Sequence, residues 1–161
     1  MHTPVYWVET GVAGRLGIMA RPRGGDWLDD ELRGLGDKGV HTLISLLTRE
    51  EEDELALGDE QGACERSGLR FLSFPIQDRS VPPRDAETSG FLRSIRDGVR
   101  AGASVAIHCR MGIGRSSLVA ASVLALLGVN PRLAFQRLAM ARGLPVPDTD
   151  EQRQWVLDLT P

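Results

Sequence analysis

The stretch HCRMGIGRS, residues 108–116, gives the strongest indication of both the fold and the chemistry of this chain. It follows a short apolar run at 103–107 and leads into the apolar run at 116–127, which are expected to be a buried strand and a buried helix. A loop between a strand and a helix lies at the carboxyl edge of an α/β sheet, where ligands bind. The stretch therefore predicts a ligand-binding loop at that edge.

The composition of this loop favours an anion. The first turn of a helix offers unpaired N–H groups and the positive end of the helix dipole. Gly112 and Gly114 let successive amides approach one phosphate, and Arg115 offers a planar fork for two of its oxygens. Cys109 lies in the same positive field, which favours its nucleophilic thiolate form. These features predict a thiolate phosphatase. The expected phosphate-binding residues are Arg110, Met111, Gly112, Ile113, Gly114 and Arg115.

The loop resembles the His-Cys-x5-Arg-Ser/Thr loop of the cysteine-dependent protein tyrosine phosphatase superfamily, and the small size of the chain resembles its dual-specificity-like branch. Residues 74–83 are similar to the loop that carries the general acid of that family, with Asp78 at the acid position. Residues 14–22 are loosely similar to the start of compact members such as the cyclin-dependent-kinase-associated phosphatase and its bacterial relatives. The resemblance covers most of the chain.

A catalytic role follows for each matched residue. Cys109 would attack phosphorus and form a cysteinyl-phosphate, while Arg115 would hold the equatorial oxygens. Asp78 would protonate the leaving oxygen and then, as a carboxylate, activate water. The resemblance further implies that Ser116 donates a hydrogen bond to the sulfur and that His108 holds the backbone of the loop.

Three other residues each have two possible roles. Asp85 is a rival acid, or an acid that complements the dipole of a first helical turn. Gln152 loosely resembles the water-positioning glutamine of the family, although Asp148 stands where the fuller pattern has glutamine; otherwise it is an exposed helix residue. Cys64 is either a packing residue at a helix end or a redox partner of Cys109.

The rest of the chain alternates expected strands and helices. Strands are predicted at 5–8, 16–20, 40–47, 69–74 and 103–107. Helices are predicted at 27–38, 48–57 (with a capping box of Thr48 and Glu51), 60–67, from Pro82-Pro83 to 101, 116–127, 131–142 and 148–159. This order predicts a three-layer α/β sandwich with a mainly parallel central sheet flanked by helices. At 161 residues the chain is expected to be one catalytic domain over 1–161.

The composition argues against a membrane-spanning, a secreted or a metal-binding protein. No apolar run approaches the roughly 18 to 20 residues that span a bilayer, and the start lacks the pattern of a signal peptide, so a cytoplasmic protein without membrane insertion is expected. Two cysteines without framework spacing fit a reducing compartment. Histidines at 2, 41 and 108 form no ligand cluster, so neither a metal nor another cofactor is expected.

Charge distribution supports an anionic substrate near the catalytic half. The formal net charge is −3. Residues 1–83 carry 9 basic and 15 acidic side chains, whereas residues 84–161 carry 10 and 7. A pI of 5.6 without a basic, aromatic stripe argues against nucleic acid.

The leading functional hypothesis is a protein tyrosine phosphatase that acts as a monomer on phosphorylated proteins or peptides, with dual specificity towards phosphoserine and phosphothreonine left open. A phosphoinositide or soluble inositol-phosphate phosphatase is the main rival among enzymes, and it would want more loop cations than Arg110 and Arg115. A phosphate-binding module without turnover is the rival from another class.

Overall fold

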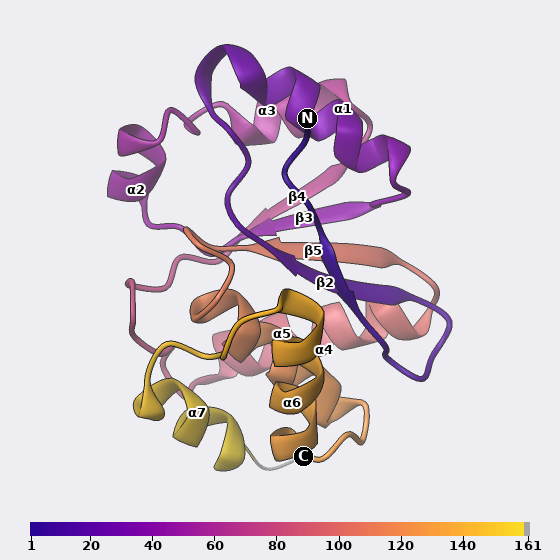
Figure 1. The fold of residues 1–161 in the computed structure, drawn as a ribbon, viewed down its shortest axis with the longest axis vertical. Coiled ribbons are helices and arrows are strands. Elements are labelled where there is room, and N and C mark those ends of the chain that lie inside the picture. The colour runs from indigo at the N-terminus through magenta and orange to yellow at the C-terminus, as the bar shows by residue number, and fades with distance from the viewer. Residues whose placement is uncertain (160–161) are drawn as a thin grey trace.

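A computed structural model describes residues 1–159, which form a five-stranded sheet between two groups of helices (Figure 1). The sheet order is β1-β2-β5-β3-β4, and only β1 runs antiparallel to its neighbour. The expected α/β sandwich with a mainly parallel sheet is confirmed. The strands are β1 (Tyr6–Val8), β2 (Arg15–Met19), β3 (Thr42–Ser45), β4 (Arg70–Ser73) and β5 (Ser104–His108). The helices are α1 (Leu28–Asp37), α2 (Arg49–Glu54), α3 (Glu60–Arg66), α4 (Ala86–Arg100), α5 (Arg115–Leu126), α6 (Pro131–Arg142) and α7 (Asp150–Leu157), with a short 3-10 turn at Gly25–Trp27.

Two apolar cores lie on opposite faces of the sheet. The α4, α5, α6 and α7 helices cover the lower face in Figure 1, and α1 and α3 cover the upper one. Every residue of β5 is buried, and so are the first ten residues of α5. A helix enclosed on all sides needs no polar face, which explains the continuous apolar run of its sequence.

Several predicted boundaries were wrong, and local capping explains them. The α4 helix begins at Ala86 rather than at Pro82-Pro83, because the Asp85 side chain accepts the Thr88 N–H at 2.8 Å and caps the helix. The α7 helix begins at Asp150 rather than Asp148, because Thr149 caps it.

Two further elements are shorter than expected. The α2 helix ends at Glu54, and Ala56 then takes a left-handed conformation with φ of 56°. The β3 strand covers only Thr42–Ser45 of the expected 40–47, because only these residues pair with both β4 and β5.

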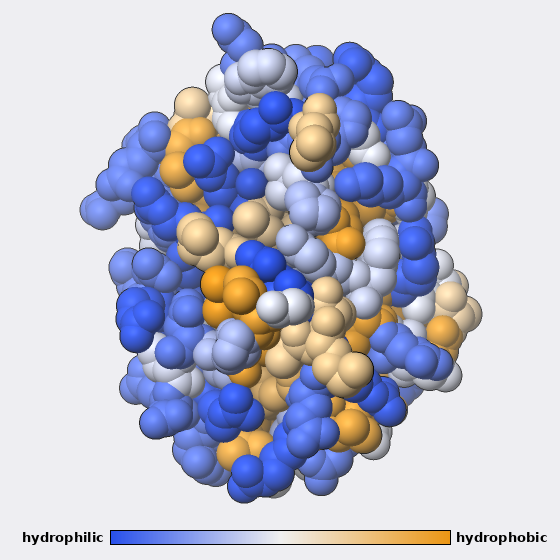
Figure 2. Space-filling model, in the orientation of Figure 1, coloured by the Kyte–Doolittle hydropathy of each residue, from blue (hydrophilic) through white to orange (hydrophobic). Residues whose placement is uncertain are grey.

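The surface is mostly hydrophilic around its outer edge, with apolar residues gathered near the middle of the face in Figure 2. Large apolar side chains that are exposed include Met111 in the loop after β5 and Leu133, Met140 and Leu144 in or after α6. Within residues 1–159, no helix has both the length and the apolar character that crossing a membrane requires.

Candidate active site

The predicted loop lies at the carboxyl edge of the parallel strands, at the left of the sheet in Figure 1. A cavity of about 170 Å³ opens there. It is lined by Asp78, Arg79, Cys109, Arg110, Met111, Gly114, Arg115 and Asp148. The cavity thus brings together the expected nucleophile, the expected arginine and the expected acid from three separate parts of the sequence.

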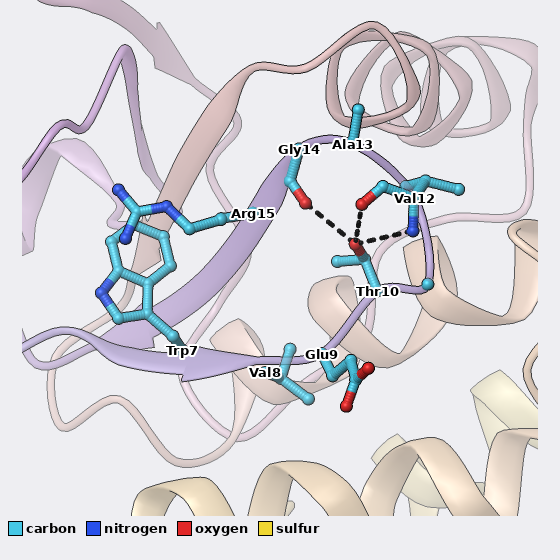
Figure 3. Close-up of a pocket in the computed structure, with 9 residues that line it drawn as sticks. Trp7, Val8, Glu9, Thr10, Val12, Ala13, Gly14 and Arg15 are labelled. Atoms are coloured by element: carbon cyan, nitrogen blue, oxygen red, sulfur yellow. Dashed lines mark hydrogen bonds between the residues drawn. The ribbon is translucent and has the colours of Figure 1, made fainter.

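A larger hollow, about 540 Å³, lies at the β1–β2 hairpin (Figure 3). It sits at the other end of the strands, because Arg15 in its lining pairs with Ser104, where β5 begins. The Thr10 hydroxyl there donates to the Gly14 carbonyl at 2.9 Å and accepts the Val12 N–H at 3.3 Å. These contacts stabilise the turn, and no cysteine or histidine lines the hollow. The residues expected to carry the chemistry therefore lie at the smaller cavity.

The backbone of the loop is held from the outside through its carbonyl groups. Arg142 donates from Nε to the Gly112 carbonyl at 3.1 Å and from Nη2 to the Met111 carbonyl at 3.0 Å. The Arg110 carbonyl accepts the Arg21 N–H at 3.2 Å. Gly112 has a φ of 71°, and a Cβ on it would lie 2.5 Å from the Met19 carbonyl carbon, so no other residue fits there.

The N–H groups of residues 110–114 have no acceptor in the described part of the chain. They precede α5, a helix of 12 residues whose amino end carries the positive pole of its dipole. Carbonyls bound outside and free amides beside a helix start are the arrangement that binds phosphate. Ile113, one of the expected phosphate-binding residues, does not line the cavity with its side chain but packs against the core.

The Cys109 side chain is buried at the bottom of this loop, with 3% of the residue exposed. Its Sγ lies 3.3 Å from Oγ of Ser116 in a hydrogen bond, so the hydroxyl is placed to donate to a thiolate. The two atoms that the resemblance pairs therefore lie within hydrogen-bond distance, and the role of Ser116 stays a prediction.

His108 connects the loop to the opposite side of the sheet. Its Nδ1 lies 3.1 Å from the Cys109 carbonyl, as expected, and its Nε2 lies 2.5 Å from Oε2 of Glu60. Burial by itself lowers the pKa of His108, but the Glu60 carboxylate outweighs burial and the net pKa is raised. A protonated imidazole donates from both nitrogens, so it holds the Cys109 carbonyl in place. No local pattern of the sequence points to Glu60, because it lies 48 residues away in α3.

Glu51, which the sequence predicted only as part of a capping box, holds the side chain of Arg115. Nη1 and Nη2 of Arg115 donate to the two carboxylate oxygens of Glu51 at 2.6 and 2.9 Å, and Nη1 also donates to the Ile76 carbonyl at 2.9 Å. The capping box itself is confirmed, because Glu51 also accepts the Thr48 N–H. Partial burial alone raises the pKa of Glu51, but hydrogen bonds from Arg115 and Thr48 outweigh it and lower the pKa.

One donor of Arg115 remains for a ligand. Its Nε is buried and has no hydrogen-bond partner among the residues that the structure describes. A buried unpaired donor is costly, and an oxygen of a bound phosphate would satisfy it. The arginine is thus oriented by Glu51, lines the cavity and keeps one unpaired donor.

The two candidate acids take different positions. Asp78 lines the cavity, and its Oδ1 lies 3.2 Å from Nη2 of Arg115. Asp85 lies outside the lining and caps α4; the Thr88 N–H bound to its carboxylate lowers the pKa of Asp85. The geometry therefore favours Asp78.

Gln152 is buried rather than exposed. Its Oε1 accepts the N–H groups of Asp148 and Thr149 at 3.0 and 3.2 Å, and its Nε2 donates to the Ser80 carbonyl at 3.2 Å. It does not line the cavity, whereas Asp148 does.

The structure also gives the surroundings of Arg110 and Cys64. Arg110 lines the cavity, but its guanidinium pairs with Glu54 at 3.3 Å. Cys64 is a free cysteine that packs in the core beneath α1 and α3, whereas Cys109 belongs to the core on the other face of the sheet. Burial raises the pKa of the Cys64 thiol to about 12, so packing is its favoured role.

Removing the acid that holds Arg115 should destabilise the fold. In Glu51→Ala, the guanidinium of Arg115, which is 1% exposed, loses its bidentate partner. We expect the free energy of unfolding at pH 7 to fall by about 3 to 5 kcal/mol in urea denaturation, as for other broken buried pairs. Because the folded pKa of Glu51 lies below its usual 4.5, this stabilisation is present above pH 4.5 and is lost as the pH falls towards the folded pKa. The stability difference between the two proteins should therefore shrink in acid.

The matched control is Glu50→Ala, which removes an exposed neighbour in α2. It should change stability by no more than about 0.5 kcal/mol. Equal stability of the two variants would show that the Glu51–Arg115 pair contributes nothing.

A family model and a curated protein match this chain. The model, described as "Polymorphic toxin system, DSP-PTPase phosphatase", matches residues 17–129. A protein of Invertebrate iridescent virus 3, provisionally named tyrosine phosphatase 067L, is 31% identical over 96 residues. The match covers 56% of this chain and 40% of the viral protein, so the chain spans less than half the length of that relative.

Solved structures match over nearly the whole chain. Kinase-associated phosphatase (KAP), solved with its catalytic cysteine replaced by serine, superposes with a TM-score of 0.88 at 21% identity over 97% of this chain and 93% of KAP. Tk-PTP in its active form gives 0.72 at 25% identity over 94% and 93%. PTPMT1 in complex with PI(5)P gives 0.72 at 18% identity over 94% and 93%. At these identities KAP and PTPMT1 are evidence for the fold alone.

Proposed function

The chain belongs to the family described as "Polymorphic toxin system, DSP-PTPase phosphatase", and from this premise we propose that it is a phosphomonoester hydrolase with a cysteinyl-phosphate intermediate. Its substrates in this proposal are phosphorylated proteins or peptides, with phosphotyrosine first and dual specificity open. One observation carries the proposal. The Cys109 thiol, the Arg115 guanidinium and the Asp78 carboxylate line one cavity of about 170 Å³.

The first step uses all three groups. A phosphate bound by the free loop amides and by Nε of Arg115 lies over the sulfur of Cys109. The thiolate attacks phosphorus, the bond from phosphorus to the leaving oxygen breaks, and Asp78 gives that oxygen its proton. Phosphate oxygens compete with Asp78 for Arg115, which frees the acid to face the leaving group.

The second step returns the enzyme to its starting state. Water attacks phosphorus and gives a proton to a carboxylate of the cavity, the phosphorus–sulfur bond breaks, and the electron pair goes to Cys109. The Ser116 hydroxyl, 3.3 Å from the sulfur, stabilises the departing thiolate.

The size and rim of the cavity support the substrate class. About 170 Å³ is smaller than the roughly 300 to 1,000 Å³ of sites that enclose a whole small ligand, so the cavity takes the phosphorylated end of a larger molecule. The exposed side chain of Met111 lines it and offers an apolar, polarisable contact to an aromatic ring. Arg110, already paired with Glu54, makes binding of additional phosphates less favourable.

The chemistry of the cysteine also points to a cell compartment for this activity. A thiolate nucleophile needs a reducing compartment, and both cysteines are free, so we propose a cytoplasmic protein. We further propose that residues 1–161 act as one catalytic domain and as a monomer, with no cofactor and no nucleic-acid partner.

A substrate panel tests the proposal. Specificity constants, kcat/KM, would be measured on phosphotyrosine peptides, phosphothreonine peptides and phosphoinositide vesicles. We expect the phosphotyrosine peptides to react fastest, orthovanadate to compete with them, and a chelator to have no effect. Faster turnover of phosphoinositides would favour the rival enzyme class, and a requirement for added divalent metal would contradict the thiolate mechanism. Binding of all three without turnover would favour the phosphate-binding module.

A further inference from the structure

We propose that Asp148 accepts the proton of the water that hydrolyses the cysteinyl-phosphate, an inference that rests on the proposed function and concerns its second step. The resemblance of the sequence assigns both proton transfers to Asp78. The cavity, however, contains two carboxylates on two different loops, and they have different surroundings.

Asp148 lies between α6 and α7, directly beside the end of the phosphate loop. It lines the same cavity as Cys109 and Gly114. A Cβ on Gly114 would lie only 2.3 Å from Oδ2 of Asp148, so the carboxylate packs against the bare backbone at this point. Its charge is therefore adjacent to the place where a phosphoryl group on Cys109 would sit.

Gln152 fixes this position. Its buried side chain accepts the Asp148 N–H at 3.0 Å and donates to the Ser80 carbonyl at 3.2 Å. Ser80 belongs to the loop that carries Asp78. One side chain thus ties together the two loops that carry the two carboxylates, and it holds both of them on the cavity.

The oxygens of Asp148 are free to accept a proton. Within residues 1–159 no hydrogen bond or ion pair engages its carboxylate, whereas Asp78 pairs with Arg115 at 3.2 Å. Asp148 is also exposed, so it stands where water enters the cavity after the leaving group has departed. Asp148, an unengaged carboxylate at the entrance, is therefore placed to accept a proton from the water. Asp78, beside Arg115, is placed to donate a proton to the leaving oxygen.

Asp148 takes part in a single displacement at phosphorus. The water oxygen forms a bond to phosphorus as the phosphorus–sulfur bond breaks, and the sulfur takes the electron pair as a thiolate. One water proton passes to Asp148, and inorganic phosphate leaves with the other. Asp148 then releases its proton to solvent, and Asp78, left as a carboxylate by the first step, takes up a proton from solvent, so the enzyme returns to its starting state without a further reactant.

The test is a comparison of burst and steady-state rates in Asp148→Asn, with p-nitrophenyl phosphate as the probe. Asparagine keeps the shape and the hydrogen-bonding oxygen but cannot take up the proton. We expect the first release of nitrophenolate to keep its rate and the steady-state rate to fall by roughly 10²-fold. A burst of one equivalent should then appear, and acid-quenched protein should carry one phosphoryl group on the peptide that contains Cys109.

The matched control is Asp150→Asn, which removes an exposed carboxylate two residues further on that does not line the cavity. It should behave as the unmodified protein. An unchanged steady-state rate in Asp148→Asn, an equal fall of burst and steady-state rates, or a change in KM alone would overturn the proposal. If the unmodified protein neither hydrolyses the probe nor forms a phosphorylated cysteine, the proposed function fails instead, and the two failures are thereby distinguished.

Discussion

Replacement of Cys109 by serine should abolish turnover while the fold is kept. A serine hydroxyl is not ionised at neutral pH and is a poor leaving group from phosphorus, so both steps fail. We expect kcat on a phosphotyrosine peptide to fall by a factor on the order of 10⁴ to 10⁶, as when other covalent nucleophiles are removed. Circular dichroism and thermal melting should show a folded protein, because serine fits the space of the buried thiol.

The chain provides its own control for this substitution. Cys64→Ser replaces a cysteine that is also fully buried, but on the other face of the sheet. It should lower stability and leave kcat per folded molecule unchanged. Retention of more than about a tenth of the activity in Cys109→Ser would rule out the thiolate mechanism, since the loss of a covalent nucleophile costs far more.

Replacement of Asp78 by asparagine should produce the second largest loss. We expect kcat to fall by about 10²- to 10⁴-fold, as is typical when a general acid is removed, with little change in substrate affinity. The defect should depend on the leaving group. The leaving group of an aryl phosphate with a very acidic phenol needs little protonation. The fall in kcat of the variant should therefore be smaller on such a substrate than on phosphotyrosine.

The pH profile separates a catalytic Asp78 from a structural one. In the unmodified protein, kcat/KM should follow a bell, because the nucleophile must be ionised while the acid is protonated. Asp78→Asn should remove the alkaline limb and keep the acidic limb, after correction for the substrate phosphate, whose second pKa is about 6. Asp85→Asn is the matched control, because its carboxylate caps α4 outside the cavity. An unchanged alkaline limb in Asp78→Asn, or an equal loss in Asp85→Asn, would exclude Asp78 as the acid.

The sequence by itself determined the strand, loop and helix around residues 108–116, and with them the positions of the proposed nucleophile and its arginine. These features depend on local patterns: an apolar run, glycines in a tight loop and a helix start directly after it. Asp78 could also be predicted from the sequence, because its loop resembles the loop that carries the general acid of the family. Helix boundaries were less accessible, because side chains such as Asp85 and Thr149 decide them by capping.

Only the tertiary structure decided which groups surround these residues. Arg115 meets Glu51 across 64 positions of sequence, and His108 meets Glu60 across 48. Asp148 reaches the cavity because Gln152 holds its loop against the loop of Asp78. Such contacts join elements that pack together only after the sheet has formed between its two layers of helices. No local pattern specifies them, because each depends on the direction in which a distant helix or loop presents its side chain.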